Sequence, residues 1–302
     1  MKIIYLFLFV ILFSPINSYS QKIALTFDDA PRKDGAYYTG IQRTNTLIQR
    51  LKDAGVVQTA FFCVSGNIDY DGHFRLLKYI DAGHIIANHT HTHQFLRNIG
   101  YDGYIQDIKT ADSILSRYNN FKKWFRFPFL QEGRDIPERD NIRMELKNLG
   151  YVNGYVTIDN YDWYIESLFQ KALKEKKKID YRKLKDFYIE HLWNSIKFYD
   201  DIALKTIGRS PNHVLLLHEN DLAALFIDDL VAYIRQQGGE IITVDEAYTD
   251  PIFNIEPQTL VLYQGRVAAI AKDMGYTGKL YQESEDEEWL DKYFENYGII
   301  QK

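Results

Sequence analysis

Cysteine is almost absent from this 302-residue sequence, in which Cys63 is the only one. A single cysteine forms no internal disulfide, so the fold must be stabilised by the packing of its core. Cys63 lies in the apolar run 59–64 and is expected to be a buried strand residue rather than a nucleophile. No cysteine lies near residue 20 either, which argues against a lipid-anchored form.

A strong excess of charge is also lacking, because 36 Lys and Arg residues oppose 41 Asp and Glu residues. The net charge of −5 indicates no basic surface of the kind that binds nucleic acid or anionic lipid, so neither is an expected partner. Aromatic residues are plentiful, with 23 Tyr, 18 Phe and 4 Trp, enough for both a core and walls on which sugars stack. No pattern specifies an oligomeric state.

Apolar runs long enough to cross a membrane are missing as well. The run Ile3–Phe13 is about half the length of a spanning helix, so no stable membrane anchor is expected. Lys2 before this run and the small residues at 18–20 after it are typical of a secretory signal peptide. The sequence therefore predicts a signal peptide over 1–20 and an exported protein, either periplasmic or secreted.

Beyond residue 20, short β-rich apolar runs alternate with helical patterns, as in a parallel sheet with crossover helices. The expected strands are 23–27, 57–63, 84–87, 123–127, 151–157, 213–217 and 240–244. The expected helices are 41–54, 73–82, 102–117, 137–149 and 221–237, and a glycine stop follows all of them except the third. This α/β pattern predicts a distorted, incomplete (β/α) barrel of about seven parallel strands, with its chemistry at the C-terminal strand ends.

Two segments interrupt the alternation. Residues 165–207 are predicted to be a helical insertion between the fifth and sixth strands, with the lysine run 174–178 on a solvated helix face. Residues 251–302 are predicted to be a C-terminal extension, and the sequence assigns it no role. The predicted catalytic domain therefore spans 21–250.

Two polar motifs fall at the ends of predicted strands. Asp28 and Asp29 follow the strand 23–27, and His89 and His93 follow another strand. A helical turn between the two histidines would point both imidazoles the same way. Two imidazoles and one carboxylate form the open three-ligand site of catalytic zinc, and the second carboxylate can then act as a base. The combination predicts a metal-dependent hydrolase.

Each motif also has a simpler interpretation. An Asp-Asp pair after a strand is usually a turn or helix cap, and histidine runs occur in solvated loops and tags. A strand through 89–93 would place His89, His91 and His93 on one face, whereas a helical turn would point His91 away from the metal. The remaining histidines without a carboxylate partner nearby in the sequence are expected to be structural: His73, His84, His191 and His213.

Five motifs occur in a fixed order along the chain. They are Thr26-Phe27-Asp28-Asp29-x-Pro31, His89-Thr90-x-x-His93, Arg126-Phe127-Pro128-Phe129, Asp159-Asn160-Tyr161-Asp162-Trp163 and Leu216-Leu217-His218. Together they resemble the polysaccharide deacetylase family, the NodB-homology domain of carbohydrate esterase family 4. The resemblance extends from about Ile23 to Pro251. Ala30 replaces the usual glycine and Phe129 the commoner tyrosine.

The resemblance implies a role for each matched residue. Asp29, His89 and His93 would bind the metal, for which zinc is the expected divalent ion. Asp28 would be the general base, and Arg126 would hold it in place.

The remaining matched residues would serve the leaving group and the substrate. His218 would be the general acid, oriented by Asp162. The backbone N–H of Phe129 would help to stabilise the oxyanion. Trp163 and Leu216 would form apolar walls around the acetyl methyl group, and the insertion that follows Trp163 would shape the substrate groove.

The family resemblance implies removal of N-acetyl groups from an envelope or extracellular polysaccharide by a metal-activated water. Three alternatives remain open at this point. The chain could be an O-acetyl polysaccharide esterase, which would use the same metal and base. It could be a non-catalytic carbohydrate-binding protein on the same fold. Hydrolysis of a small non-sugar C–N bond would require a closed pocket instead of an open groove.

Overall fold

The computed structural model describes residues 20–260 and 262–301. The predicted signal peptide falls almost entirely on residues 1–19 and so lies outside the described residues. Within the described ranges, no helix combines the length and the apolar character needed to cross a bilayer.

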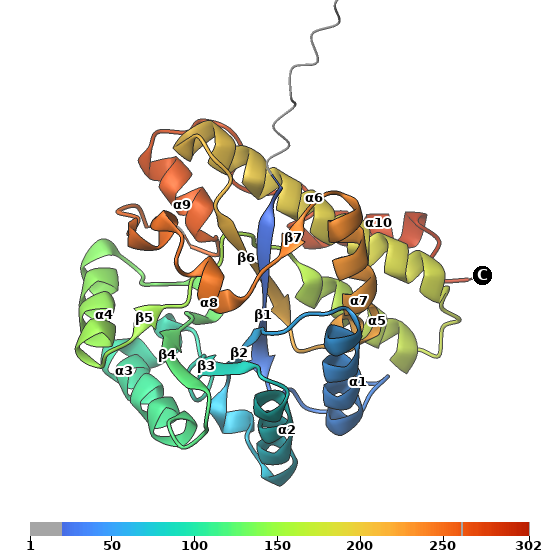
Figure 1. Cartoon of the computed structure of the whole chain (residues 1–302), viewed down its shortest axis with the longest axis horizontal. Coiled ribbons are helices and arrows are strands. Elements are labelled where there is room, and N and C mark those ends of the chain that lie inside the picture. The colour runs from blue at the N-terminus through green and yellow to red at the C-terminus, as the bar shows by residue number, and fades with distance from the viewer. Residues whose placement is uncertain (1–19, 261, 302) are drawn as a thin grey trace, which may run out of the picture.

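The described part of the chain forms a curled sheet of seven parallel strands with helices packed around it (Figure 1). The strands are β1 (Lys22–Ala30), β2 (Ala60–Cys63), β3 (Ile85–Asn88), β4 (Phe121–Phe125), β5 (Val152–Asn153), β6 (Asn212–His218) and β7 (Glu240–Ile241). Their hydrogen-bonded order is β5-β4-β3-β2-β1-β6, and β7 pairs with the first residues of β1. Residues 23–28 of β1 are all buried, as expected for a central parallel strand covered on both faces.

Helices connect the strands and cover the sheet. Those of the barrel are α1 (Gly40–Asp53), α2 (Tyr70–Asp81), α3 (Leu96–Leu115), α4 (Ile136–Asn148) and α7 (Asp221–Gln236). The predicted insertion 165–207 contains most of α5 (Asp162–Lys174) and all of α6 (Tyr181–Ile207). After β7 come α8 (Val244–Ala247), α9 (Arg266–Asp273) and α10 (Glu287–Asn296). Short 3₁₀ turns are η1 (Ser65–Asn67), η2 (Pro128–Leu130) and η3 (Pro251–Asn254). The predicted glycine stops adopt positive φ at Gly55, Gly83, Gly150 and Gly238, which confirms them.

The barrel is incomplete where the fifth strand was expected to continue. The prediction of a strand over 151–157 is wrong beyond Asn153, where β5 ends. Gly154 then passes so close to Phe62 that a Cβ atom would lie 2.5 Å from its ring. The Gly154 carbonyl then accepts a hydrogen bond from Arg126 instead of continuing the ladder. The chain next meets β6 in a single parallel bridge at Ile158. The predicted distorted, incomplete barrel is therefore confirmed.

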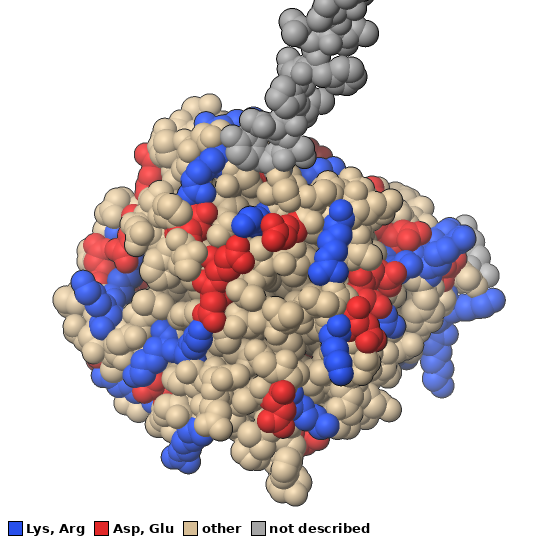
Figure 2. All heavy atoms as spheres, viewed as in Figure 1, with Lys and Arg blue, Asp and Glu red and all other residues tan. Residues whose placement is uncertain are grey.

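One continuous core joins the barrel, the insertion and the C-terminal extension. Cys63 is fully buried in it, as predicted. Apolar residues of α6, such as Tyr188, and of the extension, such as Ile270 and Phe294, belong to the same cluster. The extension therefore packs into the fold. On the face shown in Figure 2, basic and acidic side chains are interspersed, consistent with the small net charge.

Candidate active site

Two consecutive carboxylates reach the same site because β1 is irregular at its end. Successive side chains of a regular strand point to opposite faces. In β1, Asp28 pairs with Phe62 and Ala30 with Cys63, so the register shifts at Asp29. Asp29 adopts a φ of 68°, in the left-handed region. This bulge re-aims its side chain into the site that Asp28 also faces.

A bend, and not the predicted helical turn, brings His89 and His93 together. Residues 89–95 lie outside any helix, and Thr90 and His93 both adopt positive φ. The Thr90 hydroxyl accepts a hydrogen bond from the His93 N–H at 3.0 Å, and Asn88 accepts one from the Thr90 N–H at 2.8 Å. These local side-chain bonds replace helical ones. The imidazole centroids nevertheless lie 4.9 Å apart.

Asp29, His89 and His93 form a group whose possible ligand atoms all lie within 4.8 Å of one another. The Nδ1 atom of His89 lies 2.8 Å from the Arg126 carbonyl oxygen, which leaves Nε2 directed toward this group. The Asp29 Oδ1 atom is buried and has no hydrogen-bond partner among the described residues. A divalent cation would satisfy this oxygen, so the donor set fits a metal. His91 instead bonds to Ser65 at 2.8 Å.

The protonation states of the group also suit a metal. Burial lowers the pKa of His89 and of His93 to about 4, so both imidazoles are neutral near neutral pH. Burial would raise the pKa of Asp29, but His93, His218 and Arg32 outweigh this effect and hold the pKa well below its ordinary value. Neutral imidazoles and an ionised carboxylate are the forms that bind a divalent ion.

Asp28 is held by Arg126, a guanidinium that is itself almost fully buried. The Arg126 Nη1 atom lies 2.6 Å from Asp28 Oδ1 and also donates to the Thr26 hydroxyl at 2.8 Å. The guanidinium lies over the Phe62 ring, 3.7 Å from its centroid. Burial raises the pKa of Asp28 above its ordinary value, and Arg126 opposes this rise. The carboxylate is thus fixed in position and is a better proton acceptor than an exposed aspartate.

His218 enters the site from β6, paired in register with Asp28 of the neighbouring strand. Its Nδ1 atom lies 2.6 Å from Asp162 Oδ1, and its backbone N–H donates to Asp162 Oδ2 at 3.0 Å. Burial disfavours the charged imidazole, but Asp162 and the nearby carboxylates outweigh burial and raise the pKa of His218 to about 9. The side chain is therefore a positioned proton donor. Asp162 is the first residue of α5, so this helix begins inside the site, three residues before the predicted insertion 165–207.

These groups line a cleft of about 520 Å³. Phe129 adopts a φ of 57°, and its ring stacks on Phe95 with centroids 3.6 Å apart. Trp163, which is 37% exposed, lies beside Tyr161 with centroids 5.2 Å apart. Leu216 also lines the cleft.

The structure brings the ten predicted site residues together. Eight line the cleft, and the other two, Arg126 and Asp162, bond directly to Asp28 and His218. The cleft is also lined by residues that were not predicted, among them Arg32, Phe95, Tyr161 and Tyr263. Of these, only Tyr161 lies within one of the five motifs, so the others carried no sequence signal.

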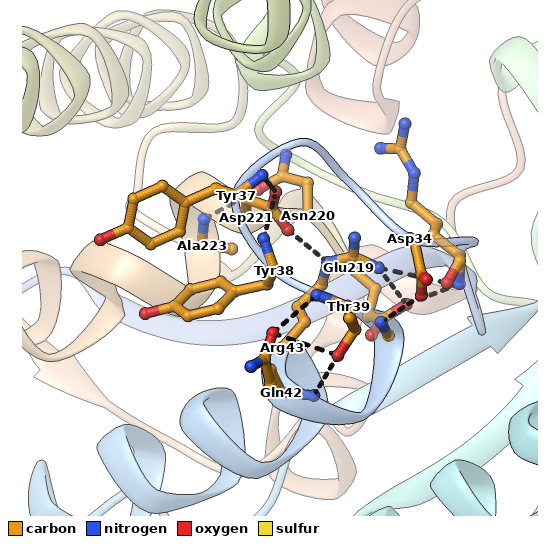
Figure 3. A network of polar contacts seen from close by, with 12 residues as sticks. Asp34, Tyr37, Tyr38, Thr39, Gln42, Arg43, Glu219, Asn220, Asp221 and Ala223 are labelled. Atoms are coloured by element: carbon orange, nitrogen blue, oxygen red, sulfur yellow. Dashed lines mark hydrogen bonds and ion pairs between the residues drawn. The ribbon is translucent and has the colours of Figure 1, made fainter. Parts of the chain in front are cut away.

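A buried polar network fixes the segment that follows His218 (Figure 3). Asp221 accepts hydrogen bonds from the Arg43 Nε atom at 2.7 Å and from the N–H groups of Tyr37 and Tyr38. Glu219 is fully buried, pairs with the Arg75 guanidinium at 2.7 Å, and donates its own N–H to the Asp28 carbonyl. The network therefore ties the β6–α7 junction to the loop after β1 and to α1 and α2.

Three of the histidines predicted to be structural are buried away from the cleft. His84 faces the Thr59 N–H, and His191 faces the Tyr161 N–H. His213, at the opposite end of β6 from His218, does have a carboxylate partner, because Asp200 of α6 lies 3.0 Å away. The partner is 13 residues away in the sequence and is brought to His213 by the fold.

Comparison with known proteins finds a family to which part of the chain is similar. The polysaccharide deacetylase family model matches residues 17–154, a segment that contains Asp28, Asp29, His89, His93 and Arg126. This segment is therefore similar to the polysaccharide deacetylase family. A peptidoglycan-N-acetylglucosamine deacetylase of Bacillus cereus is 29% identical over 109 residues. The match covers 36% of this chain and 36% of that relative, so the chain spans about a third of its length.

Solved structures of carbohydrate esterase family 4 proteins and peptidoglycan deacetylases share the fold of this chain. A peptidoglycan deacetylase from Bacillus subtilis has a TM-score of 0.51 and 19% identity, covering 76% of this chain and 91% of its own. A family 4 pseudoenzyme from Bacillus anthracis has a TM-score of 0.53 and 16% identity, covering 76% of this chain and 66% of its own. The fold is thus shared by an enzyme and by a pseudoenzyme, and function must be argued from the site.

Proposed function

We propose that this chain is a metal-dependent hydrolase that removes N-acetyl groups from an envelope or extracellular polysaccharide. One observation carries the proposal: an Asp29/His89/His93 group lies in the same cleft as Asp28 and His218, and its buried Asp29 Oδ1 atom has no partner in the described part of the chain. The cleft therefore contains side chains suited to act as metal ligands, base and acid in amide hydrolysis. The family match and the B. cereus relative support this assignment.

Each residue has a defined task in this proposal. A divalent ion held by Asp29, His89 and His93, with zinc expected, would lower the pKa of a water to about 7 and polarise the acetyl carbonyl. Asp28, fixed by Arg126, accepts the proton of the attacking water.

The other site residues act on the rest of the acetamido group. His218 donates a proton to the departing nitrogen, and Asp162 keeps the imidazole in the required tautomer and orientation. The Phe129 N–H helps to stabilise the oxyanion. Trp163 and Leu216 contact the acetyl methyl group.

Two alternatives make different predictions. An O-acetyl polysaccharide esterase would use the same residues on an ester substrate. A carbohydrate-binding pseudoenzyme would lack a ligand, the base or the acid, yet every one of these positions carries a functional side chain here. The complete set of groups favours an enzyme. We further propose that the protein is exported, because its substrate lies outside the cytoplasm.

Acetate release from a panel of substrates tests the proposal. The panel consists of chitooligosaccharides, peptidoglycan, bacterial poly-N-acetylglucosamine and acetylated xylan. We expect acetate from at least one N-acetylated glycan, loss of activity in His93→Ala, and retention in the matched control His91→Ala. Release from acetylated xylan alone would identify an O-acetyl esterase, and release from none of the four would contradict the proposal.

A further inference from the structure

The C-terminal extension contributes a side chain to the cleft. Tyr263 lines it together with Asp159 and Trp163, although it comes from the segment 251–302 and from none of the five family motifs. Its side chain is 43% exposed, so one part packs against the protein while another faces the open cleft. An aromatic residue in this position offers a flat apolar surface and a polar hydroxyl to whatever enters.

The backbone of Tyr263 is held in an unfavourable conformation. Its φ is 60°, in the left-handed region, which a bulky side chain rarely adopts. Such a residue persists only where its surroundings impose the conformation, and these residues are concentrated at functional sites.

The residues that follow Tyr263 provide this support. The buried Gln264 accepts a hydrogen bond from the Tyr199 hydroxyl at 3.3 Å and donates to Glu285 at 3.3 Å. The Arg266 N–H donates to the Val156 carbonyl at 2.8 Å, just before the Asp159–Trp163 motif. The extension is therefore anchored to α6 and to the β5–α5 segment immediately beside Tyr263. A side chain placed by such contacts has little freedom to lose when it binds a ligand.

The Arg266 side chain adds a second anchor. Its guanidinium lies over the Tyr155 ring, 3.9 Å from the centroid, and donates to the Phe253 carbonyl at 2.9 Å. Arg266 therefore joins the end of η3 to the start of α9 and packs both against Tyr155. Tyr263 lies in the segment between these two elements.

We propose that Tyr263 is a substrate-specificity residue that stacks on a sugar ring next to the one bearing the reacting acetamido group. The inference rests on the proposed function. The C–H face of a pyranose is apolar and packs on an aromatic ring, while its hydroxyls suit a neighbouring carboxyl such as that of Asp159. The extension thus adds a binding position to the family domain, and the enzyme prefers chains of sugars over single units.

The test compares Tyr263→Ala and Tyr263→Phe with Tyr281→Ala, an exposed tyrosine of the same extension that does not line the cleft. Each variant is assayed on a chitopentaose and on an aryl acetate, which carries no sugar. Because the stacked ring binds substrate and transition state alike, KM for the pentasaccharide rises about threefold to tenfold in Tyr263→Ala while kcat is retained. Tyr263→Phe and Tyr281→Ala behave like the wild type. An unchanged KM, or an equal loss on the aryl acetate, overturns the inference.

Binding separates this inference from the proposed function. Titration calorimetry of chitopentaose with Asp28→Asn, with and without Tyr263→Ala, measures affinity in the absence of turnover. Weaker binding of the double variant supports the inference even if the wild type releases no acetate, an outcome that would contradict only the proposed function. If the wild type releases acetate but Asp28→Asn and the double variant bind the pentasaccharide with equal affinity, the inference is overturned and the proposed function is retained. Absence of binding in Asp28→Asn overturns the inference as well.

Discussion

Asp28 and Asp29 are adjacent in the chain, yet the structure gives them opposite electrostatic settings. Asp29 faces two imidazoles, and its pKa is held well below its ordinary value. Asp28 is deeply buried, and its pKa is raised despite the guanidinium of Arg126. A ligand must remain ionised, whereas a base must accept a proton. The opposite pKa shifts of the two carboxylates therefore match the roles that we propose for them.

Substitution of the two aspartates separates these roles. We expect Asp29→Asn to lose stoichiometric metal, because the amide supplies no charge. Asp28→Asn should retain the metal and lose about 10²–10⁴-fold in turnover, because only the proton acceptor is removed. Elemental analysis and acetate release measure the two effects on the same samples. Normal turnover in metal-loaded Asp28→Asn would contradict the assignment of the base.

His218 should matter more for an amide than for an activated ester, because an amine leaves only after protonation. His218→Ala is expected to reduce acetate release from a chitooligosaccharide more strongly than phenol release from an aryl acetate. Asp162→Asn should show a milder form of the same bias, since Asp162 orients the imidazole and does not donate the proton. The ratio of the two rates is measured in the wild type and both variants. Equal losses on both substrates would show that His218 is not the leaving-group acid.

Among the residues of the cleft, those that lie in sequence motifs could be predicted from the sequence. The sequence did not indicate Phe95 and Tyr263, which line the cleft. Phe95 stacks on Phe129 because the bend after His93 returns the chain to η2, and Tyr263 arrives from the extension. Neither placement follows from local pattern, since both depend on how distant segments fold together.

At the scale of elements, the site is held by ion pairs between helices and strand ends. Arg75 of α2 meets Glu219 after β6, and both side chains are at most 3% exposed. An unpaired buried charge strongly destabilises the fold, whereas an exposed ion pair contributes little to its stability. These contacts fix the position of His218 relative to Asp28.

Glu219→Gln should therefore destabilise the fold by about 3–5 kcal/mol, because it leaves the Arg75 guanidinium buried without its partner charge. The matched control is Asp228→Asn, which breaks the half-exposed pair with Arg50 and should cost about 0–1 kcal/mol. Urea unfolding gives both free energies. Similar small losses in the two variants would mean that the buried network does not stabilise the site.

The elements also show where sequence patterns fail. The predicted helical turn over 89–93 is absent because the side chains of Asn88 and Thr90 bond to the backbone. The last predicted strand, 240–244, is reduced to Glu240–Ile241 because the helix α8 begins at Val244, capped by Thr243. Apolar runs indicate that a strand exists, but its length depends on the pairing partner that tertiary structure provides.

At the scale of the whole molecule, buried neutral histidines make stability depend on pH. Burial lowers the pKa of His84 to about 4, below its ordinary value of 6.5. Because the pKa of His84 is depressed in the folded state, the stability that the neutral side chain contributes is fully present above about pH 6.5. This stability is lost as the pH falls toward 4. Between these values the group reduces the free energy of unfolding by about 1.4 kcal/mol per pH unit.

Comparison with His84→Asn isolates this contribution. We expect the wild type to lose stability more steeply than the variant between pH 6.5 and 4, and both to have similar slopes above pH 7. Urea unfolding at several pH values provides the slopes. Parallel curves over the whole acid range would mean that His84 is protonated equally well in the folded state.

The overall architecture was predictable because buried parallel strands appear in the sequence as short apolar runs separated by amphipathic helices. The role of the extension was not. Its contacts, such as that of Gln264 with Tyr199, join segments far apart in the chain, and no local pattern marks them.

We expect hydrolysis to depend on a metal held by Asp29, His89 and His93. The most direct test is to titrate zinc into metal-free protein and to measure acetate release from an N-acetylated glycan at each step. We expect no release without metal and a rise that saturates at about one ion per chain. Full acetate release from metal-free protein, or none from protein saturated with zinc, would contradict this expectation.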